Sequence, residues 1–232
     1  MSAAVVAVVI GASGGAGATT LALGVALHLA MTSRHPTLLE LDLVKGGLAA
    51  GLGIDADRGL HDLRPVADEL KPEHLARVAY PHRAGMSVIL APGPSRDAGE
   101  WDGAAIGRLV VAASAGRKPV VVDGGTGLTI TSAAASRTAA HVFVVTTPSV
   151  VGASRARAVL DGLVAPGRLV VGPPLGREDL GDRATGLAVG VPVASALPRS
   201  PGEAHDLGSG RWPRGRRLPL ATAIARLAEG LE

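Results

Sequence analysis

Cysteine is absent from the 232 residues, and aromatic side chains make up only 2% of them. The absence of cysteine excludes disulfides, thiolate nucleophiles and cysteine-ligated zinc. The scarcity of aromatic rings removes the stacking platforms on which binders of single-stranded nucleic acid depend. No apolar run reaches the length of a membrane span, although 47% of the residues are hydrophobic. These absences favour a protein of a reducing compartment, and we expect it in the cytoplasm.

Lysine is also scarce, and nearly all of the positive charge is arginine. The formal net charge is +3, and the lysines are Lys45, Lys71 and Lys118. No Lys or Arg precedes the first apolar run, so we expect no secretory leader. The densest basic segment is Arg211–Arg217, which could touch DNA or anionic lipid. A solvated loop is the favoured interpretation of this segment, and we expect no nucleic-acid partner.

Apolar β-branched runs alternate with helical patterns, which predicts an α/β fold with one doubly wound, mostly parallel sheet and helices on both faces. At this length we expect one domain, residues 1–232. The expected strands are Ala4–Ile10, Thr37–Asp42, Met86–Ala91, Pro119–Asp123, His141–Thr146, Arg168–Gly172 and Val191–Ala194. The expected helices are Thr19–Met31, Glu73–Ala79, Ala104–Ala115, Ser132–Ala139, Ser154–Leu163, Glu178–Leu187 and Leu218–Leu231. Two segments rich in Gly, Pro and charge are expected to be surface loops, Gly93–Gly99 and Arg199–Arg217.

A glycine-rich turn follows the first expected strand and opens the first helix. Gly14, Gly15 and Gly17 let the backbone approach an anion closely, because no Cβ stands in the way. Successive backbone N–H groups and the helix N-terminus converge on the same point. Phosphate is therefore the expected ligand, although tight packing alone would also explain some of these glycines.

The sequence of this turn is Ser13-Gly14-Gly15-Ala16-Gly17-Ala18-Thr19-Thr20. It resembles the deviant Walker motif K-G-G-V-G-K-T-T of the MinD/ParA family of P-loop ATPases, with Ser13 and Ala18 at the two lysine positions. The resemblance implies that Mg²⁺ and ATP are the ligands. The residues that would bind the nucleotide are Gly14, Gly15, Ala16, Gly17, Ala18, Thr19 and Thr20.

Three later segments carry the same resemblance in the family's order. Glu40–Ala49 is similar to the D-x-D segment of the CpaE-like or TadZ-like branch, which serves pilus and secretion systems. Val120–Gly127 resembles the Walker B strand and its D-x-P-x-G turn, with Gly125 in place of the proline. Leu197-Pro198 resembles the late L-P-x-D loop, where the family's adenine usually sits.

Each matched polar position has an expected role. Thr19 would offer a hydroxyl to Mg²⁺, and Asp123 would hold the water shell of that ion. Asp42, at another strand end, would orient the attacking water or bind the metal's second shell, as an aspartate does in the family. Simpler interpretations stay open: a helix cap for Thr19, a turn residue for Asp123 and a solvated loop residue for Asp42. For Glu40, a charge tolerated near a sheet edge is as good an interpretation as a functional role.

The two missing lysines predict weak binding and weak or absent hydrolysis. In the family, one lysine neutralises the β and γ phosphates and the other reaches the nucleotide of a dimer partner. Such a contact is worth roughly 1.5–3 kcal/mol, so its loss weakens binding about tenfold to a hundredfold. Lys71 and Lys118 are expected to point away, which leaves Lys45 or Arg155 as candidates for a rescue. Gly172-Pro173 stands where the family tends to place an asparagine that reads adenine, so adenine selectivity is in doubt.

A different class of nucleotide binder has a similar turn. Gly11–Gly17 also resembles the loop of short-chain dehydrogenases, in which Glu40 or Asp42 would bind a ribose hydroxyl of NAD(P). Those enzymes need a tyrosine with a lysine four residues later. Tyr80 is the only tyrosine, and Ala84 stands at that spacing. A dehydrogenase is therefore the less favoured interpretation.

The resemblance implies a homodimeric, nucleotide-binding regulator that positions or assembles pilus, secretion or septum-site machinery. A protein partner in that membrane-associated machine is expected, and so is recruitment to the inner face of the plasma membrane. A scaffold that binds no nucleotide is the open alternative. The last helix places Ile224, Leu227 and Leu231 on one stripe, which favours packing against the sheet over a membrane anchor. Any contact with the membrane is then expected to be indirect.

Overall fold

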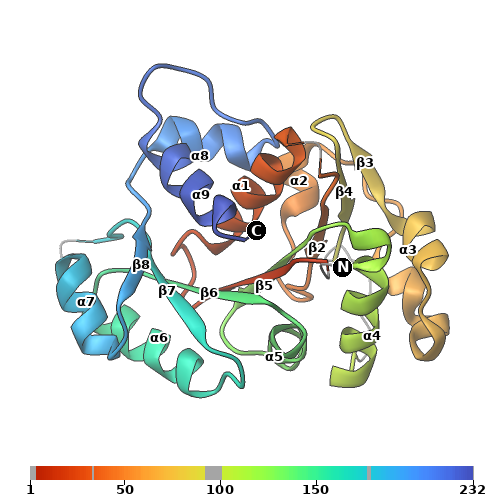
Figure 1. Ribbon diagram of the computed structural model, residues 1–232, viewed down its shortest axis with the longest axis horizontal. Coiled ribbons are helices and arrows are strands. Elements are labelled where there is room, and N and C mark those ends of the chain that lie inside the picture. The colour runs from red at the N-terminus through yellow and green to blue at the C-terminus, as the bar shows by residue number, and fades with distance from the viewer. Residues whose placement is uncertain (1–3, 33, 92–100, 177–178, 232) are drawn as a thin grey trace.

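The computed structural model describes residues 4–32, 34–91, 101–176 and 179–231. Among these residues, an eight-stranded sheet crosses the molecule in the order β3-β4-β2-β5-β1-β6-β7-β8 (Figure 1). The strands are β1 (Val6–Gly11), β2 (Thr37–Glu40), β3 (Tyr80–His82), β4 (Met86–Ile89), β5 (Val120–Thr126), β6 (His141–Thr146), β7 (Gly167–Val171) and β8 (Val193–Ala196). Neighbouring strands are parallel except for β3, which pairs antiparallel with β4 at one edge. The predicted α/β architecture is confirmed.

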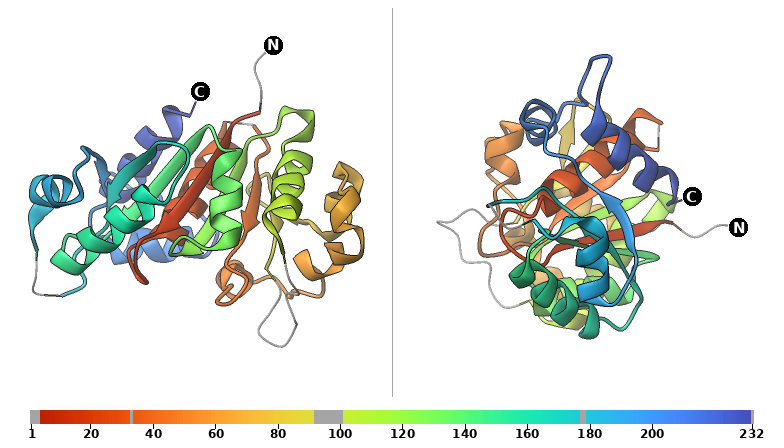
Figure 2. Two further views of the ribbon diagram at one scale, coloured as in Figure 1. Left: turned by 90° about the horizontal axis from the view of Figure 1, so that it is seen from below. Right: turned by 90° about the vertical axis from the view of Figure 1, so that its left-hand side faces the viewer.

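Helices cover both faces of the sheet (Figure 2). One face carries α1 (Ala18–Met31), α2 (Leu48–Leu52), α8 (Pro201–Gly208) and α9 (Pro219–Glu229). The other carries the 3-10 helix η1 (Leu60–Glu69), α3 (Pro72–Val78), α4 (Gly103–Ala113), α5 (Ile130–Arg137), α6 (Val150–Asp161) and α7 (Gly181–Val189). A short 3-10 turn, η2 (Ala115–Arg117), connects α4 to β5.

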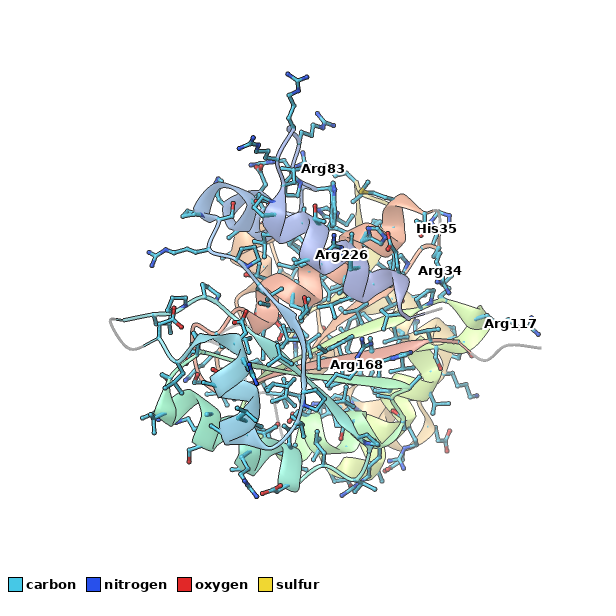
Figure 3. All side chains as sticks on the ribbon, turned by 60° about the vertical axis from the view of Figure 1, so that its left-hand side comes forward. Arg34, His35, Arg83, Arg117, Arg168 and Arg226 are labelled. Atoms are coloured by element: carbon cyan, nitrogen blue, oxygen red, sulfur yellow. The ribbon has the colours of Figure 1, made fainter. Side chains whose placement is uncertain are left out.

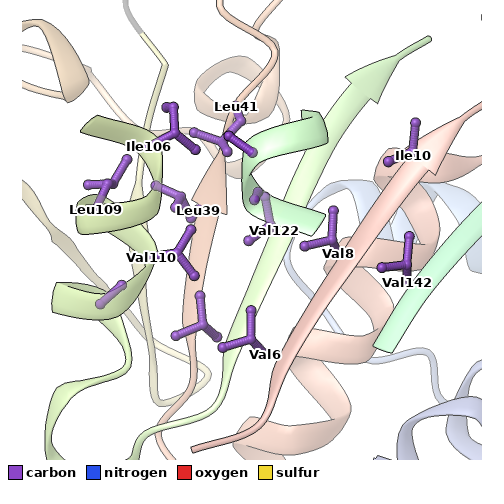
Figure 4. Close-up of a cluster of buried hydrophobic side chains, with 14 of the residues drawn as sticks. Val6, Val8, Ile10, Leu39, Leu41, Ile106, Leu109, Val110, Val122 and Val142 are labelled. Carbon is purple, nitrogen blue, oxygen red and sulfur yellow. The ribbon is translucent and has the colours of Figure 1, made fainter. Parts of the chain in front are cut away.

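The two hydrophobic cores lie between the sheet and these helical layers. On one face, Val6, Val8 and Ile10 of β1 pack in a cluster that Ile106 and Leu109 of α4 complete (Figure 4). The alternate residues of β1 point to the opposite face and pack under α1. Because helices cover both faces, the central strands are apolar at nearly every position, which explains the continuous apolar runs in the sequence.

The carboxyl ends of the central strands meet at one edge of the sheet. β1 lies between β5 and β6, and β5 lies between β1 and β2. The loops that follow β1, β2 and β5 therefore emerge side by side. In open parallel sheets this edge, where the chain order reverses, is the usual place for a ligand.

The C-terminal helix packs on the molecule, as its apolar stripe predicts. Ile224, Leu227 and Leu231 are buried, and Ile224 fills the space above Gly24 of α1. α9 packs mainly on α1, and it also contacts α8 and strand β8 of the sheet. Among the described residues, no helix combines the length and apolar character needed to cross a membrane.

The expected loop at Arg199–Arg217 is wrong in its first half, which forms α8. Pro201 occupies the first turn, where the missing N–H costs nothing, and Glu203 follows within that turn. The Glu203 carboxylate is buried and accepts the N–H groups of Leu220 and Ala221, so it fixes the start of α9. The expected loop at Gly93–Gly99 and the expected helix start at Glu178 lie outside the described residues; α7 begins at Gly181.

Candidate functional site

The turn between β1 and α1 shapes a small concave surface at the carboxyl edge of the sheet. Gly15 and Gly17 have φ values of 77° and 100°, which favour glycine because a Cβ would be strained there. Gly17 is the N-cap of α1, and no side chain caps this helix end. The first N–H groups of α1 are therefore available to an anion, with the positive end of the helix dipole behind them.

A cavity of about 230 Å³ opens at this turn. We call it the phosphate pocket; its lining residues are Ser13, Gly15, Ala16, Gly17, Ala18, Thr19, Thr20, Asp42, Gly125 and Thr126. The predicted nucleotide-binding residues from Gly15 to Thr20 all line it, whereas Gly14 is exposed and does not. Asp42 is the one charged side chain among these lining residues, and none of them is a cation.

Three oxygen-bearing side chains from three separate elements meet beside the phosphate pocket. Asp123 is 2% exposed near the carboxyl end of β5, and burial raises the pKa of its carboxyl. The Thr19 hydroxyl, on the first turn of α1, faces this carboxyl and partly offsets that rise in pKa, as does the N–H of Gly125. The charge of Asp42 adds to the rise. Hydroxyl and carboxylate oxygens are the donors that Mg²⁺ prefers, and this set fits that ion together with phosphate and water.

Asp42 is held in place by the backbone around it. Its Oδ1 accepts the N–H of Lys45 at 2.9 Å and the N–H of Val44 at 3.3 Å. Its side chain lies so close to Gly125 that a Cβ there would come within 2.8 Å of the Asp42 Cβ and Cγ. Gly125 has φ 69°, which a proline cannot adopt. The replacement of the family's proline by Gly125 therefore accompanies a different turn, one that brings Asp42 against the end of β5.

Glu40 is structural, and the expectation of a sheet-edge position is wrong. β2 lies between β4 and β5 in the interior of the sheet. The Glu40 side chain is 3% exposed and accepts the N–H groups of Gly47 at 2.7 Å, Leu48 at 2.9 Å and Ala91 at 3.0 Å. Burial raises the pKa of its carboxyl, and these three bonds oppose the rise. Glu40 thus joins the start of α2 to the end of β4.

A second cavity of about 330 Å³ begins where the phosphate pocket ends. We call it the base pocket; it shares Gly15, Gly17 and Thr20 with the phosphate pocket. Its remaining lining residues are Pro173, Pro174, Leu175, Leu197, Pro198, Arg199, Ser200, Pro201, Ala204 and Leu220. Leu197-Pro198 was expected here, whereas Pro174 and Leu175 carry no motif that could have identified them. The prolines have no backbone N–H to donate. Among the described lining residues, Thr20, Arg199 and Ser200 have side chains that can donate hydrogen bonds to a ligand.

Gly172 lies against the phosphate loop. Its N–H donates to the Thr146 carbonyl at 2.6 Å, and a Cβ on Gly172 would run into the carbonyl of Ala16. No side chain fits at this position while the loop keeps its shape. An asparagine that reads adenine, as in the family, is therefore sterically excluded at Gly172 itself.

The lysines of the chain do not line the phosphate pocket. Lys118 precedes β5 and so lies at the opposite, amino edge of the sheet, and Lys71 is the exposed N-cap of α3. Lys45 is exposed beside the Asp42 turn, and Arg155 is exposed on α6. Lys71 and Lys118 therefore lie away from the phosphate loop, as expected. Neither Lys45 nor Arg155 is among the described lining residues of the phosphate pocket, so nothing supports the idea that either replaces the missing loop lysine.

The topology does not match a dinucleotide-binding dehydrogenase. In that fold the first two strands pair directly, whereas here β5 separates β1 from β2. Tyr80 lies on edge strand β3, where its hydroxyl donates to Asp57 Oδ1 at 2.7 Å and accepts the N–H groups of Asp57 and Arg58. The only tyrosine therefore has a structural role.

A parallel α/β sheet with a glycine-rich loop, a helix-terminal threonine and two neighbouring aspartates defines the class of P-loop nucleotide-binding folds. Comparison with solved structures places the fold with the ParA and MinD ATPases. A ParA family ATPase from Chlorobium tepidum TLS matches with TM-score 0.85 at 19% sequence identity, over 99% of this chain and 99% of that one. The septum site-determining protein MinD from Pyrococcus horikoshii OT3, complexed with Mg-ADP, matches with TM-score 0.78 at 20% identity, over 99% and 96%. A variant of McdA from Cyanothece in complex with ATP matches with TM-score 0.71 at 16% identity, over 100% and 97%.

Sequence comparison adds no closer relative. No family model matches the chain, and no curated protein matches it. The identities to the solved structures are low, so the likeness establishes the fold, and the chemistry has to be argued from the site.

Proposed function

We propose that this chain is a MinD/ParA-type protein that binds Mg²⁺ and ATP weakly and hydrolyses ATP slowly or not at all. The observation that carries the proposal is a contrast at one site: Thr19 and Asp42 line the phosphate pocket and Asp123 lies beside them, yet none of the described lining residues is a cation. The residues proposed to contact phosphate are Gly14, Gly15, Ala16, Gly17, Ala18, Thr19 and Thr20, and those proposed for Mg²⁺ are Thr19 and Asp123.

The charge balance of the pocket supports weak binding. The triphosphate of ATP brings several negative charges to a site whose charged side chains, Asp42 and Asp123, are themselves acidic. Backbone N–H groups and the dipole of α1 provide the attraction that the chain itself supplies. Bound Mg²⁺ would supply the missing positive charge. Binding should therefore depend strongly on Mg²⁺.

The same balance supports slow turnover. Negative charge must be stabilised at the leaving and attacking oxygens during phosphoryl transfer, and a loop lysine usually contributes there. Ala18 and Ser13 cannot do so. Asp42, held by its two backbone N–H bonds, remains the proposed group for orienting water.

At the level of the cell, we propose a CpaE-like spatial or assembly regulator of pilus, secretion or septum-site machinery, working in the cytoplasm and at the inner face of the plasma membrane. The similarity to MinD, ParA and McdA structures supports a positioning role. Apolar side chains are exposed around the pocket: Val44 is 86%, Ile130 71% and Leu175 61% exposed. Such a patch beside a ligand site suits a protein contact, and a homodimer that closes over the nucleotide is our proposed occupant, with a protein component of the machine as the second partner.

Calorimetric titration tests the nucleotide site. The wild-type protein is titrated with ATP and with a slowly hydrolysed analogue, with and without Mg²⁺, and with NADH as a control ligand. The proposal expects weak binding that requires Mg²⁺. No binding of any of these would leave the alternative, a scaffold whose phosphate loop has only a structural role.

Restoring the loop lysine sharpens the test. Ala18→Lys should tighten Mg²⁺-ATP binding about tenfold to a hundredfold, since one charge-assisted contact is regained. Ala18→Met is the matched control, because it adds similar length without charge. Equal affinity of the two variants would contradict the view that a missing cation limits binding.

A further inference from the structure

A third and larger cavity continues from the base pocket. It measures about 900 Å³ and lies between the carboxyl ends of β7 and β8, the start of α7 and the start of α9. It shares five lining residues with the base pocket, namely Pro173, Pro174, Leu197, Pro198 and Arg199. This cavity therefore adjoins the base pocket, which in turn adjoins the phosphate pocket.

This third cavity has the cations that the phosphate pocket lacks. Arg199, Arg216, Arg217 and Arg226 line it, and we call it the arginine groove. They come from three separate places: the loop after β8, the loop before α9, and α9 itself, from which Arg226 projects (Figure 3). Asp179 and Asp182 line it as well, so the groove has more positive than negative side chains.

None of the four arginines forms an ion pair with a described residue. Arg211, just before the groove in the chain, differs: its Nη2 lies 2.9 Å from Asp206 Oδ1. Each of the four is exposed, so its guanidinium is accessible to a ligand. Guanidinium groups present planar sets of N–H donors that match phosphate oxygens, so the groove suits a phosphorylated group.

We propose that the chain binds a nucleotide phosphorylated on both sides of its ribose, with the 5′ phosphates in the phosphate pocket and a further phosphate, on a ribose hydroxyl, in the arginine groove. This rests on the proposed function, because the 5′ end occupies the P-loop. The phosphate pocket and the base pocket together can hold a mononucleotide. The arginine groove is large enough to hold a further phosphorylated group of that nucleotide. The concave shape and the position next to the base pocket favour a small molecule over a flat lipid surface.

The experiment compares matched pairs of nucleotides by calorimetry in the presence of Mg²⁺. One pair is GDP and guanosine 3′,5′-bis(diphosphate); the other is AMP and adenosine 3′,5′-bisphosphate. In each pair the doubly phosphorylated ligand should bind at least about tenfold more tightly, the gain expected from new charge-assisted contacts. Equal affinities within both pairs would overturn the inference.

Variants locate the effect. The double variant Arg216→Gln with Arg217→Gln should lose most of the advantage while binding GDP and AMP as the wild type does. Arg214→Gln is the matched control, since Arg214 is an exposed arginine of the same loop that does not line the groove. An advantage that survives in the double variant would place the second phosphate elsewhere and overturn the assignment to the groove.

The outcomes also separate this inference from the proposed function. Binding of GDP or AMP without an advantage for the doubly phosphorylated ligand rejects the inference alone. Absence of binding by all four nucleotides, while Mg²⁺-ATP still binds, also rejects the inference alone, and absence of Mg²⁺-ATP binding as well rejects both. Sedimentation with phosphatidylglycerol vesicles distinguishes a lipid headgroup as the source of phosphate: vesicle binding that depends on Arg216 and Arg217, without a nucleotide advantage, counts against the inference.

Discussion

The two walls of the phosphate pocket differ in what they offer a ligand. One wall is formed by Thr19 and Asp42, with Asp123 directly beside them; we call these three residues the acidic wall, and they are suited to a divalent cation. The other is the turn from Ser13 to Ala18, which offers backbone N–H groups and no positive side chain. Under the proposed function, side chains would hold the metal directly, whereas the phosphates would be held largely by the backbone and by that metal.

A second comparison is between Asp123 of the acidic wall and Glu40, a neighbouring buried carboxylate outside it. Glu40 and Asp123 are register partners on β2 and β5, both are buried, and burial raises the pKa of each. Glu40 accepts three backbone N–H groups, whereas Asp123 accepts one and faces Thr19. Burial and the direction of the pKa shift are therefore the same for a structural and for a proposed functional carboxylate, and only the bonding partners distinguish them.

The largest expected effect comes from substituting Gly125, against which Asp42 of the acidic wall packs. Gly125→Ala would place a Cβ within 2.8 Å of Asp42 at φ 69°, so Asp42 or the β5 turn must move. The expected loss in the free energy of unfolding is about 2–4 kcal/mol, from backbone strain and overpacking together. Urea denaturation measures it, and Mg²⁺-dependent nucleotide binding should be lost as well.

Gly127→Ala is the control for that variant. Gly127 also has a positive φ, 80°, but nothing lies within 4 Å of a Cβ built there. It should cost only the backbone strain, about 1–2 kcal/mol. If both variants lost the same stability, the close packing of Asp42 on Gly125 would not be what matters.

Glu40→Gln should show that the structural carboxylate is needed for its charge and its two acceptor oxygens. The amide nitrogen of glutamine cannot accept an N–H, so the Ala91 N–H loses its partner if the amide oxygen keeps the Gly47 and Leu48 N–H groups, and those two lose theirs in the opposite orientation. A buried unsatisfied group costs about 1–3 kcal/mol, measurable by urea denaturation. Glu69→Gln, at an exposed position, serves as the control and should change little.

Much of this fold is predictable because its strongest signals are local. β-branched runs such as His141–Thr146 gave β6 at its observed bounds, since a strand buried on both faces must be apolar throughout. The sequence did not predict β3 (Tyr80–His82), a short edge strand with a proline at its centre. It also missed α8 and η1, where Gly and Pro within short helices resemble loop composition, and tertiary packing of Leu60, Leu63 and Leu207 decides the structure.

The candidate site was predictable where residues are close in sequence and not where the fold brings them together. The phosphate turn could be read from one continuous segment. The contact of Asp42 with Gly125 and the approach of Gly172 to Ala16 depend on strand order and loop conformation, which no local pattern encodes. The role of Glu40 could not be assigned because its three N–H partners come from two distant segments.

Asp123→Asn should separate the metal role of the acidic wall from its effect on stability. Asparagine keeps an oxygen that can accept the Gly125 N–H, and it removes the buried charge whose cost raises the pKa of Asp123. The variant should therefore be more stable at pH 7, seen as a higher Tm in thermal denaturation. Calorimetric titration should show that Mg²⁺ no longer strengthens nucleotide binding. A less stable variant would mean that the Asp123 charge has a compensating partner.

The smallest effect is the pH dependence that this buried carboxyl imposes. A carboxyl whose pKa is raised in the folded state stays protonated there while the unfolded chain already ionises above its ordinary value of 3.8. The folded state then holds more protons, so Asp123 contributes stability below that value and loses it as the pH rises through the folded pKa. Urea denaturation from pH 4 to pH 7 should accordingly show nearly equal free energies of unfolding for Asp123→Asn and the wild type at pH 4. The variant should then become increasingly more stable than the wild type as the pH rises. A stability difference that stayed constant across this range would show that ionisation of Asp123 is not its cause. The effect of the substitution would then come from altered packing or hydrogen bonding at this position.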